Sequence, residues 1–246
     1  TAVEVAPADL ATIAWMVNLG TVRFHPWPVR AADTEVVDQL RIDLDPQPGV
    51  GFGLAVRAAL ELRAVLAEAG LTGFCKTSGG RGVHVFAPIT GADFIDARHA
   101  AIAVGRELAR RMPEAVTVNW WKEERGERVF VDFNQMARDR LMTSAYSIRP
   151  TPRGLVSAPL EWDELADADP SDFTVLSMPA RFAGGGDPWA AMDDTPPGSL
   201  EVALEWYARD AAGGEGELPY PPEYPKMPGE PPRVQPSKIN PANWKE

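Results

Sequence analysis

The sequence predicts an α/β protein, because strand-like and helix-like hydrophobic patterns alternate along residues 40–112. Residues 40–46 alternate apolar and polar side chains, as in a strand with one face in a core. Residues 52–70 and 93–112 place apolar side chains on one stripe, which is typical of amphipathic helices. Between them, residues 73–88 predict two strands joined by a glycine turn. With 246 residues and 45% hydrophobic composition, the chain can bury a sizeable core, as one large or two intimate domains.

The first forty residues predict one helix and one short strand. Residues 8–18 follow helical spacing and end before Gly20, and Trp15 is expected in the core. Residues 22–27 alternate as a strand that prolines would terminate. His25 falls on the side away from the apolar residues of that strand, and the pattern alone favours a surface histidine.

Two carboxylates leave the same face of the strand at residues 40–46. Asp43 and Asp45 are two positions apart, so their side chains lie roughly 7 Å apart along the strand. Hard oxygen ligands at this spacing can bind divalent cations, although a lone Asp-x-Asp pair is more often a solvated strand face than a metal site. Pro46 ends the strand, and a helix follows a tight turn. The acids therefore sit at the carboxyl end of a βα unit, where open α/β sheets place their sites.

The turn between the next two strands carries several polar donors. Glycines let backbone N–H groups surround an anion, and side chains on either side would add further donors. A β-hairpin whose turn needs glycine explains the glycines alone but not the donors. The order of residues excludes a Walker A loop. The residues concerned are Lys76, Ser78, Gly79, Gly80, Arg81 and His84.

A third acid, Asp132, follows the alternating strand of residues 128–133. Gln135 comes next, and a further short strand over residues 145–149 delivers Arg149. One acid from a separate strand beside an Asp-x-Asp pair is the arrangement that phosphoryl-transfer enzymes use to hold two cations about 4 Å apart.

The remaining chain differs in composition. Residues 162–165 and 199–211 predict helices, whereas residues 184–186 and the proline-rich run 219–241 are expected to be extended. We divide the chain into a catalytic core over residues 1–165 and an acidic, proline-rich segment over residues 166–246 that wraps the core. Three tryptophans are its expected anchors: Trp189, Trp206 and Trp244.

The net charge of −11 argues against a nucleic-acid partner until its distribution is considered. Residues 1–154 carry 18 Lys and Arg against 18 Asp and Glu, while residues 155–246 carry 6 against 17. A neutral first segment that gathers acids at a metal site can still present a basic surface to a polyanion. The single cysteine, Cys75, and the lack of a secretory signal or of an apolar run of about 20 residues predict a cytoplasmic protein without a membrane span.

Together these motifs resemble one family, the polymerase domain of the bacterial non-homologous end-joining DNA ligase D and its stand-alone relatives, within the archaeo-eukaryotic primase and primase-polymerase superfamily. The similarity covers roughly residues 11–165 in the family's order. The matching stretches are Asn18-Leu19-Gly20, His25-Pro26-Trp27, Asp43-Leu44-Asp45-Pro46, Lys76 to His84, Val131-Asp132-Phe133 with Gln135, Tyr146 to Arg149, and Pro159 to Leu165.

The resemblance implies a primase-polymerase fold with a small RRM-like palm and mixed or antiparallel sheets flanked by helices. It implies that Asp43, Asp45 and Asp132 bind two Mg²⁺ or Mn²⁺ ions. The implied nucleotide-binding residues are the turn Lys76, Ser78, Gly79, Gly80, Arg81 and His84, together with Gln135, Arg149 and, at the rim, His25. Arg81 stands where many relatives have lysine. The resemblance also implies that an N-terminal part of the family, which grips a DNA end, is missing here.

The implied activity is template-dependent addition of nucleotides, preferably ribonucleotides, to a primer 3′-hydroxyl during end joining or gap repair. Its partners would be nucleoside triphosphates, primer–template or gapped or broken duplex DNA, a DNA ligase and an end-binding repair protein. Two alternatives stay open. A metal-dependent Asp-x-Asp glycosyltransferase explains the paired acids but not Asp132, and a non-catalytic primase-like module leaves all three acids without a use.

Overall fold

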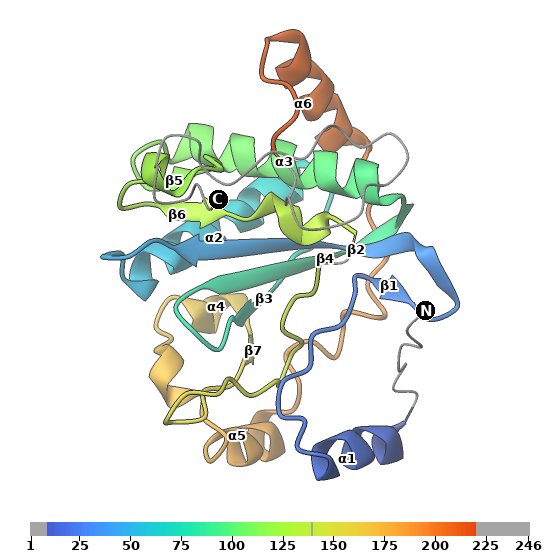
Figure 1. Ribbon diagram of the computed structural model, residues 1–246, viewed down its shortest axis with the longest axis vertical. Coiled ribbons are helices and arrows are strands. Elements are labelled where there is room, and N and C mark those ends of the chain that lie inside the picture. The colour runs from blue at the N-terminus through green and yellow to red at the C-terminus, as the bar shows by residue number, and fades with distance from the viewer. Residues whose placement is uncertain (1–8, 139, 220–246) are drawn as a thin grey trace, which may run out of the picture.

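The computed structural model describes residues 9–138 and 140–219, and a seven-stranded mixed sheet forms its centre (Figure 1). The strands follow the order β5-β6-β2-β4-β3-β7, and β1 pairs with the N-terminal end of β2. Neighbouring strands are antiparallel except β5 and β6, which are parallel. The strands are β1 (Val29–Arg30), β2 (Asp33–Pro46), β3 (Phe74–Thr77), β4 (Val83–Ala92), β5 (Val116–Thr117), β6 (Val129–Val131) and β7 (Pro159–Leu160).

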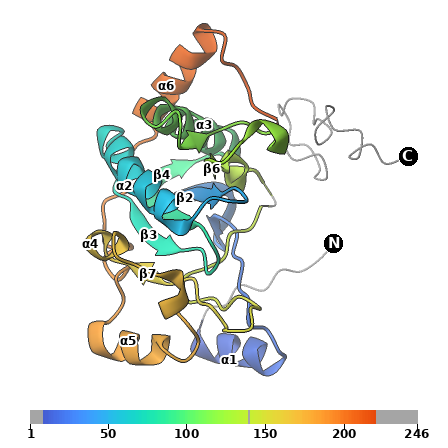
Figure 2. The same ribbon diagram turned by 90° about the vertical axis from the view of Figure 1, so that its left-hand side faces the viewer.

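Two long helices, α2 (Phe52–Glu68) and α3 (Phe94–Arg111), cover one face of the sheet, as Figures 1 and 2 show. Their apolar stripes are buried against the strands, and a third helix, α6 (Glu201–Ala212), packs on the outer side of α3. The side chain of Asp93 caps α3 by accepting a hydrogen bond from the backbone N–H of Asp96 at 2.7 Å. The predictions of both long helices and of the glycine hairpin are confirmed.

The other face of the sheet is covered by short helices and irregular chain. Among the described residues this layer contains α1 (Leu10–Asn18), α4 (Trp162–Leu165) and α5 (Met178–Gly185), below the sheet in Figure 1. The described residues also form three 3₁₀-helices: η1 (Lys122–Glu124), η2 (Phe133–Met136) and η3 (Pro170–Asp172). No helix in the described part of the chain is long and apolar enough to cross a membrane.

The alternation in β2 is present as predicted. Leu40, Ile42 and Leu44 are buried in the core beneath the helices, while Asp43 and Asp45 leave the opposite face. β2 ends at the proline after Asp45, so the two acids lie at the end of the central strand. The sequence pattern thus placed both acids correctly relative to the core.

Two predicted short strands are wrong. Residues 22–27 form no strand, and the segment is joined to residues 144–148 by single hydrogen bonds, such as Phe24 N to Ser147 Oγ at 2.8 Å. Residues 145–149 contribute only an isolated bridge between Ile148 and Val156. The physical reasons are the prolines of the first segment, which lack an N–H, and Tyr146, whose φ of 62° is incompatible with a strand.

Two further expectations are corrected. Helix α1 forms, but none of its residues is buried, and the side chain of Trp15 is 54% exposed rather than in the core. Gly184 and Gly185 close helix α5 instead of being extended, and the chain turns at Gly186 with a φ of 75°. The proline-rich run beyond residue 219, including Trp244, lies outside the described residues.

The described part of the C-terminal segment packs on the core at several points. Trp189 Nε1 donates to the backbone oxygen of Cys75 at 2.8 Å, and its ring lies 5.1 Å from that of Phe86. Trp206 packs partly buried against the core. Both tryptophans therefore act as anchors, as expected, while the division of the chain at residue 165 stays a prediction.

Residues 215–219 form a strap along α3. The guanidinium of Arg98 is fully buried and donates to Glu217 and to the backbone oxygen of Leu218. Glu217 also accepts from His99 at 2.8 Å. Burial acts to raise the pKa of Glu217, but the bond from His99 and the charge and hydrogen bond of Arg98 outweigh it and lower the pKa to about 2.

Replacing Glu217 with glutamine is expected to destabilise the fold by about 2 kcal/mol at pH 7, because the buried Arg98 loses its carboxylate. A carboxyl whose pKa is lowered in the folded state stabilises that state at pH values above its ordinary pKa of 4.5. This stabilisation disappears as the pH falls toward 2. The difference between wild type and Glu217→Gln should therefore shrink over that range. Urea unfolding at pH 7 and at pH 3 measures it.

The control is Glu215→Gln, because Glu215 lies on the same strap with 60% of its side chain exposed. An exposed ion pair contributes about 0–1 kcal/mol, so this variant should unfold close to wild type. Equal destabilisation by both substitutions would show that the strap, and not the buried pair, determines the effect.

Candidate functional site

Four predicted site residues form one row across the sheet. Lys76 on β3 lies directly opposite His84 on β4, and His84 lies directly opposite Asp43 on β2. Asp132 follows β6, and its backbone N–H donates to the backbone oxygen of Asp43 at 2.9 Å. Directly opposite residues of antiparallel strands share a face, so all four side chains leave the face away from α2 and α3.

The side chains of this row contact one another. His84 Nε2 lies 3.5 Å from Asp43 Oδ1, and His84 Nδ1 lies 2.7 Å from Lys76 Nζ. Lys76 Nζ also lies 2.5 Å from Ser157 Oγ. Lys76 is fully buried and His84 is 4% exposed, so the row is a polar network inside the protein and opens only toward the acids.

The three carboxylates gather at the open end of the row. Asp45 is exposed and shares the face of Asp43, and Asp132 accepts hydrogen bonds from Asn134 N at 3.1 Å and Gln135 Nε2 at 2.9 Å. Across residues 9–138 and 140–219, no three His, Cys, Asp or Glu side chains are arranged to hold a metal ion as they stand. The strands thus bring the predicted metal ligands together, but their side chains are not arranged to coordinate an ion in this conformation.

The charges at this end fit a cation. Burial, followed by the charges of the neighbouring Asp132 and Asp45, raises the pKa of Asp43 to about 8. Burial likewise raises the pKa of Asp132, against the hydrogen bond from Gln135. Carboxylates that repel one another in a poorly solvated place are stabilised by a bound divalent ion, and oxygen donors suit Mg²⁺ and Mn²⁺.

The glycine turn packs directly against β2. A Cβ on Gly82 would lie 2.4 Å from the backbone oxygen of Leu44, and Gly79 has a φ of +70°. Ser78 Oγ accepts from the backbone N–H groups of Gly80 and Gly82, both at 3.1 Å. Gly79 and Gly82 are therefore needed for the shape of the hairpin, and the acceptor side of the Ser78 hydroxyl is used within the turn.

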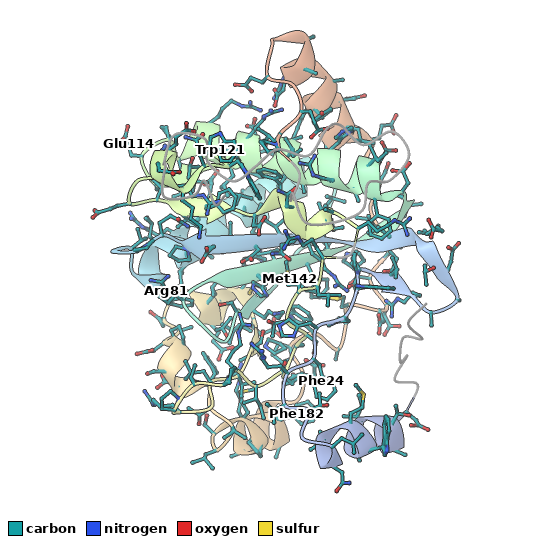
Figure 3. The ribbon with its side chains drawn as sticks, in the orientation of Figure 1. Phe24, Arg81, Glu114, Trp121, Met142 and Phe182 are labelled. Atoms are coloured by element: carbon teal, nitrogen blue, oxygen red, sulfur yellow. The ribbon has the colours of Figure 1, made fainter. Side chains whose placement is uncertain are left out.

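Arginines flank this turn. Arg149 Nε donates to the backbone oxygen of Ser78 at 3.0 Å, which brings a charge predicted from a distant segment to the turn. Arg81 is exposed at the tip of the β3–β4 hairpin, as Figure 3 shows. Both cations can meet an anion at this edge of the sheet.

One further predicted residue, His25, lies near the row, and Lys76 lies within it. His25 is partly buried, with its Nε2 3.0 Å from Thr143 Oγ1, and burial and the charges of Arg149, Arg23 and Lys76 lower its pKa. Lys76, by contrast, is covered on all sides and contacts His84 and Ser157. In this arrangement it does not reach a ligand on the open face.

The structure adds two residues that the sequence reasoning missed. Ser157 completes the row although it lies 81 positions from Lys76, and no motif marks it. Arg41 is 5% exposed, donates to the backbone oxygens of Pro26 and Trp27, and lies 4.9 Å from the Phe86 ring. The same alternation that placed Asp43 puts Arg41 on the site face, so that signal was available.

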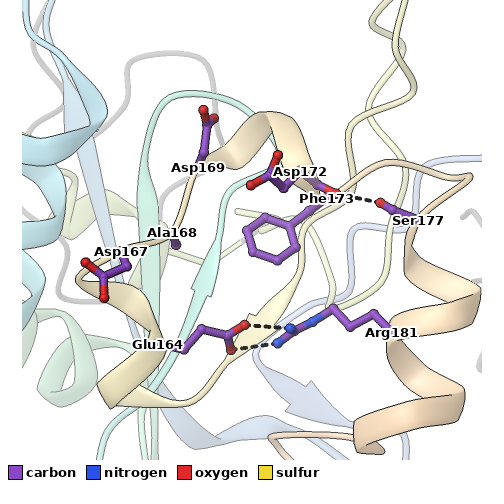
Figure 4. Close-up of a pocket in the computed structure, with 8 residues that line it drawn as sticks. All are labelled: Glu164, Asp167, Ala168, Asp169, Asp172, Phe173, Ser177 and Arg181. Atoms are coloured by element: carbon purple, nitrogen blue, oxygen red, sulfur yellow. Dashed lines mark hydrogen bonds and ion pairs between the residues drawn. The ribbon is translucent and has the colours of Figure 1, made fainter.

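A cavity of about 450 Å³ lies elsewhere, between α4, η3 and α5 (Figure 4). Half of its lining residues are acidic, and its one arginine, Arg181, forms a bidentate pair with Glu164 at 2.5 and 2.6 Å. It contains none of the predicted site residues and does not suit a polyanion. The cavity is also lined by Asp167, Asp169, Asp172 and Phe173.

The family described as LigD, primase-polymerase domain, matches residues 1–189. The multifunctional non-homologous end joining protein LigD of Pseudomonas aeruginosa is 33% identical over 178 residues, which are 71% of this chain and 21% of that protein. The LigD of Mycolicibacterium smegmatis is 29% identical over 219 residues, or 87% of this chain and 28% of that protein. The chain thus spans less than a third of the length of these relatives.

Among solved structures, the chain is similar to the polymerase domain of Mycobacterium tuberculosis ligase D in complex with DNA. The two superpose with a TM-score of 0.68 at 29% identity, covering 76% of this chain and 68% of the other. The expected family and the expected mixed fold flanked by helices are therefore confirmed. The match favours a nucleotidyltransferase over the Asp-x-Asp glycosyltransferase.

Asp43→Asn is expected to stabilise the protein in chelator at pH 8.5 by about 1–3 kcal/mol. A carboxyl whose pKa is raised in the folded state is neutral and does not affect stability at pH values below its ordinary pKa of 3.8. It destabilises the fold increasingly as the pH rises from there through about 8. Asparagine does not ionise, so the gain should vanish at pH 4. Urea unfolding at both pH values measures it, with the exposed Asp194→Asn as the control that should change little. A loss of stability at pH 8.5 would contradict the assigned repulsion.

Gly82→Ala is expected to destabilise the fold by about 2–3 kcal/mol, because its Cβ would overlap the Leu44 carbonyl. Gly80→Ala is the matched control in the same turn, since its Cβ would lie an ordinary 3.4 Å from Ser78 Oγ. Thermal unfolding of the two variants compares them. Similar melting temperatures would show that the turn tolerates side chains at both positions.

Proposed function

The chain belongs to the family of LigD primase-polymerase domains, and from this premise we propose that it adds nucleotides to a primer 3′-hydroxyl under the direction of a template. The family is one of DNA-directed nucleotidyltransferases. The observation that carries the proposal for this chain is the row that sets Asp43 and Asp132 side by side, next to the glycine turn.

Asp43, Asp45 and Asp132 would hold Mg²⁺ or Mn²⁺, which as a Lewis acid acidifies the attacking hydroxyl and neutralises charge on the leaving pyrophosphate. Gln135 orients Asp132 through its 2.9 Å hydrogen bond. Burial and the neighbouring carboxylates raise the pKa of Asp43, and bound cations would lower it again by stabilising the ionised carboxylate.

The cations and donors beside the acids would bind the triphosphate. Arg149 and Arg81 flank the turn, and His84 Nε2 faces the carboxylates from the neighbouring strand. Fixed donors of this kind stabilise the charge that develops on phosphoryl oxygens in the transition state. His25 lies at the rim of this group, in line with a contact to the nucleotide.

The substrates follow from the family. The M. tuberculosis neighbour was solved in complex with DNA, and the relatives are named as non-homologous end joining proteins. For this chain we propose primer–template, gapped or broken duplex DNA as the polymer substrate and nucleoside triphosphates, preferably ribonucleotides, as the monomers. We further propose a cytoplasmic role beside a DNA ligase and an end-binding protein. The nucleotide preference and the protein partners rest on the family resemblance.

Asp43→Ala and Asp132→Ala are each expected to lower template-dependent primer extension at least about 100-fold, because each removes a carboxylate from the cation site. The assay uses a labelled primer on a gapped template, with ATP, UTP, GTP and CTP and, separately, the four deoxynucleotides, in Mn²⁺ at low salt. Chelation should abolish extension by the wild type, and added Mn²⁺ should restore it.

Asp194→Ala serves as the control, since this exposed acid lies outside the site and should leave extension unchanged. Wild-type extension that survives in Asp43→Ala would overturn the assignment of the site. DNA binding without any extension by the wild type would instead support the non-catalytic module that the sequence left open.

A further inference from the structure

Lys76 belongs to the sequence motif of the glycine turn, yet the structure buries it completely. Its ammonium group lies between Ser157 Oγ at 2.5 Å and His84 Nδ1 at 2.7 Å, and 5.5 Å from the centre of the Phe86 ring. A fully buried lysine is rare in proteins unless it has specific partners.

The hydrogen bonds assign the protons. The Ser157 hydroxyl donates to the backbone oxygen of Thr77 at 2.7 Å, so its oxygen must accept from Lys76. In its ammonium form Lys76 has hydrogens and no lone pair, so it can only donate to His84 Nδ1. A ring nitrogen that accepts a hydrogen bond carries no proton, so the imidazole hydrogen lies on Nε2.

We propose that Lys76 is a positioning residue, which acts through His84 by holding the ring with Nδ1 as an acceptor and Nε2–H pointing toward Asp43. This inference rests on the proposed function: an N–H at this place would donate to a triphosphate oxygen, whereas the opposite tautomer would present a lone pair that repels it. Lys76 supplies the orientation and does not itself touch the nucleotide.

The contacts of the neighbouring strand explain why the lysine can do this. Thr77 N donates to Ala158 O at 2.9 Å, and Thr77 Oγ1 donates to Val156 O at 3.1 Å. These bonds fix the segment that carries Ser157 against β3. Ser157 therefore anchors Lys76 from the side opposite His84, and the ring orientation is fixed through two successive hydrogen bonds.

The first test is the tautomer of His84 in the wild-type chain, measured by long-range ¹H–¹⁵N NMR on protein with labelled histidine. The chain has three histidines, so His84→Gln assigns the signal. We expect an unprotonated Nδ1 and a protonated Nε2. A proton on Nδ1 would overturn the proposal, and this measurement needs neither activity nor a lysine variant that folds.

The second test is Lys76→Met, which keeps the length of the side chain and removes the donor, compared with Lys76→Gln, whose amide can still donate. We expect the tautomers of His84 to mix or reverse in Lys76→Met and the wild-type pattern to return at least in part in Lys76→Gln. The exposed Lys122→Met should leave the pattern unchanged. A folded Lys76→Met with the wild-type tautomer would also overturn the proposal, and if neither lysine variant folds, the wild-type tautomer decides.

The third test separates this inference from the proposed function. In primer extension, Lys76→Met should raise the KM for the nucleotide about 10–100-fold, as the loss of residues that orient metal-binding histidines lowers metal affinity or activity, and affect kcat less. An unchanged KM in folded Lys76→Met contradicts the positioning role. If the wild type shows no extension while the tautomers behave as expected, the proposed function fails and the role of Lys76 in orienting His84 stands.

Discussion

The site depends on one constraint, the register of β2 against β4 and β6. Because side chains alternate with a period of two, a shift of one residue would turn Asp43 and His84 to opposite faces and separate the row. The close approach of Gly82 to the backbone oxygen of Leu44 holds this register, since only a residue without a Cβ fits there. The glycine of the turn thus determines where the acids stand.

The ionised carboxylates of the row also destabilise the folded state. Asp43 and Asp132 are held together where water is scarce, and the raised pKa of Asp43 reports the cost. Asp132 is kept in place from behind: Asn134 N donates to its carboxylate at 3.1 Å, and Arg98 Nε donates to Asn134 Oδ1 at 2.9 Å. Arg98 is in turn held by the strap at Glu217, so a segment 85 residues further along the chain supports the placement of one site carboxylate. The C-terminal strap therefore belongs to the energetics of the site.

The sequence predicted the elements whose pattern is local and regular. The alternation of β2, the stripes of α2 and α3 and the hairpin were readable because one face of each packs on the core. It failed at residues 22–27 and 145–149, where tertiary hydrogen bonds replace a ladder. The burial of Lys76 was not readable either, because β4 and β3 are covered on both faces and the covering residue Ser157 comes from a distant loop. The pairing of β6 with β2 places Asp132 beside Asp43. The hydrophobic periodicity of each strand does not specify which strands pair.

The site stands between two layers of different character, and their junction determines its geometry. The carboxylates belong to the sheet, whose strands are fixed by ladders and by the helices behind them. Arg149 and Ser157 belong to the irregular layer, which has few ladder bonds of its own among the described residues. Contacts between the layers, such as Arg149 to Ser78 O and Lys76 to Ser157, fix Arg149 and Ser157 relative to the acids. A buried lysine at that junction is therefore better suited than an apolar residue, because its directional bonds specify one relative position of the two layers, whereas apolar packing would tolerate several.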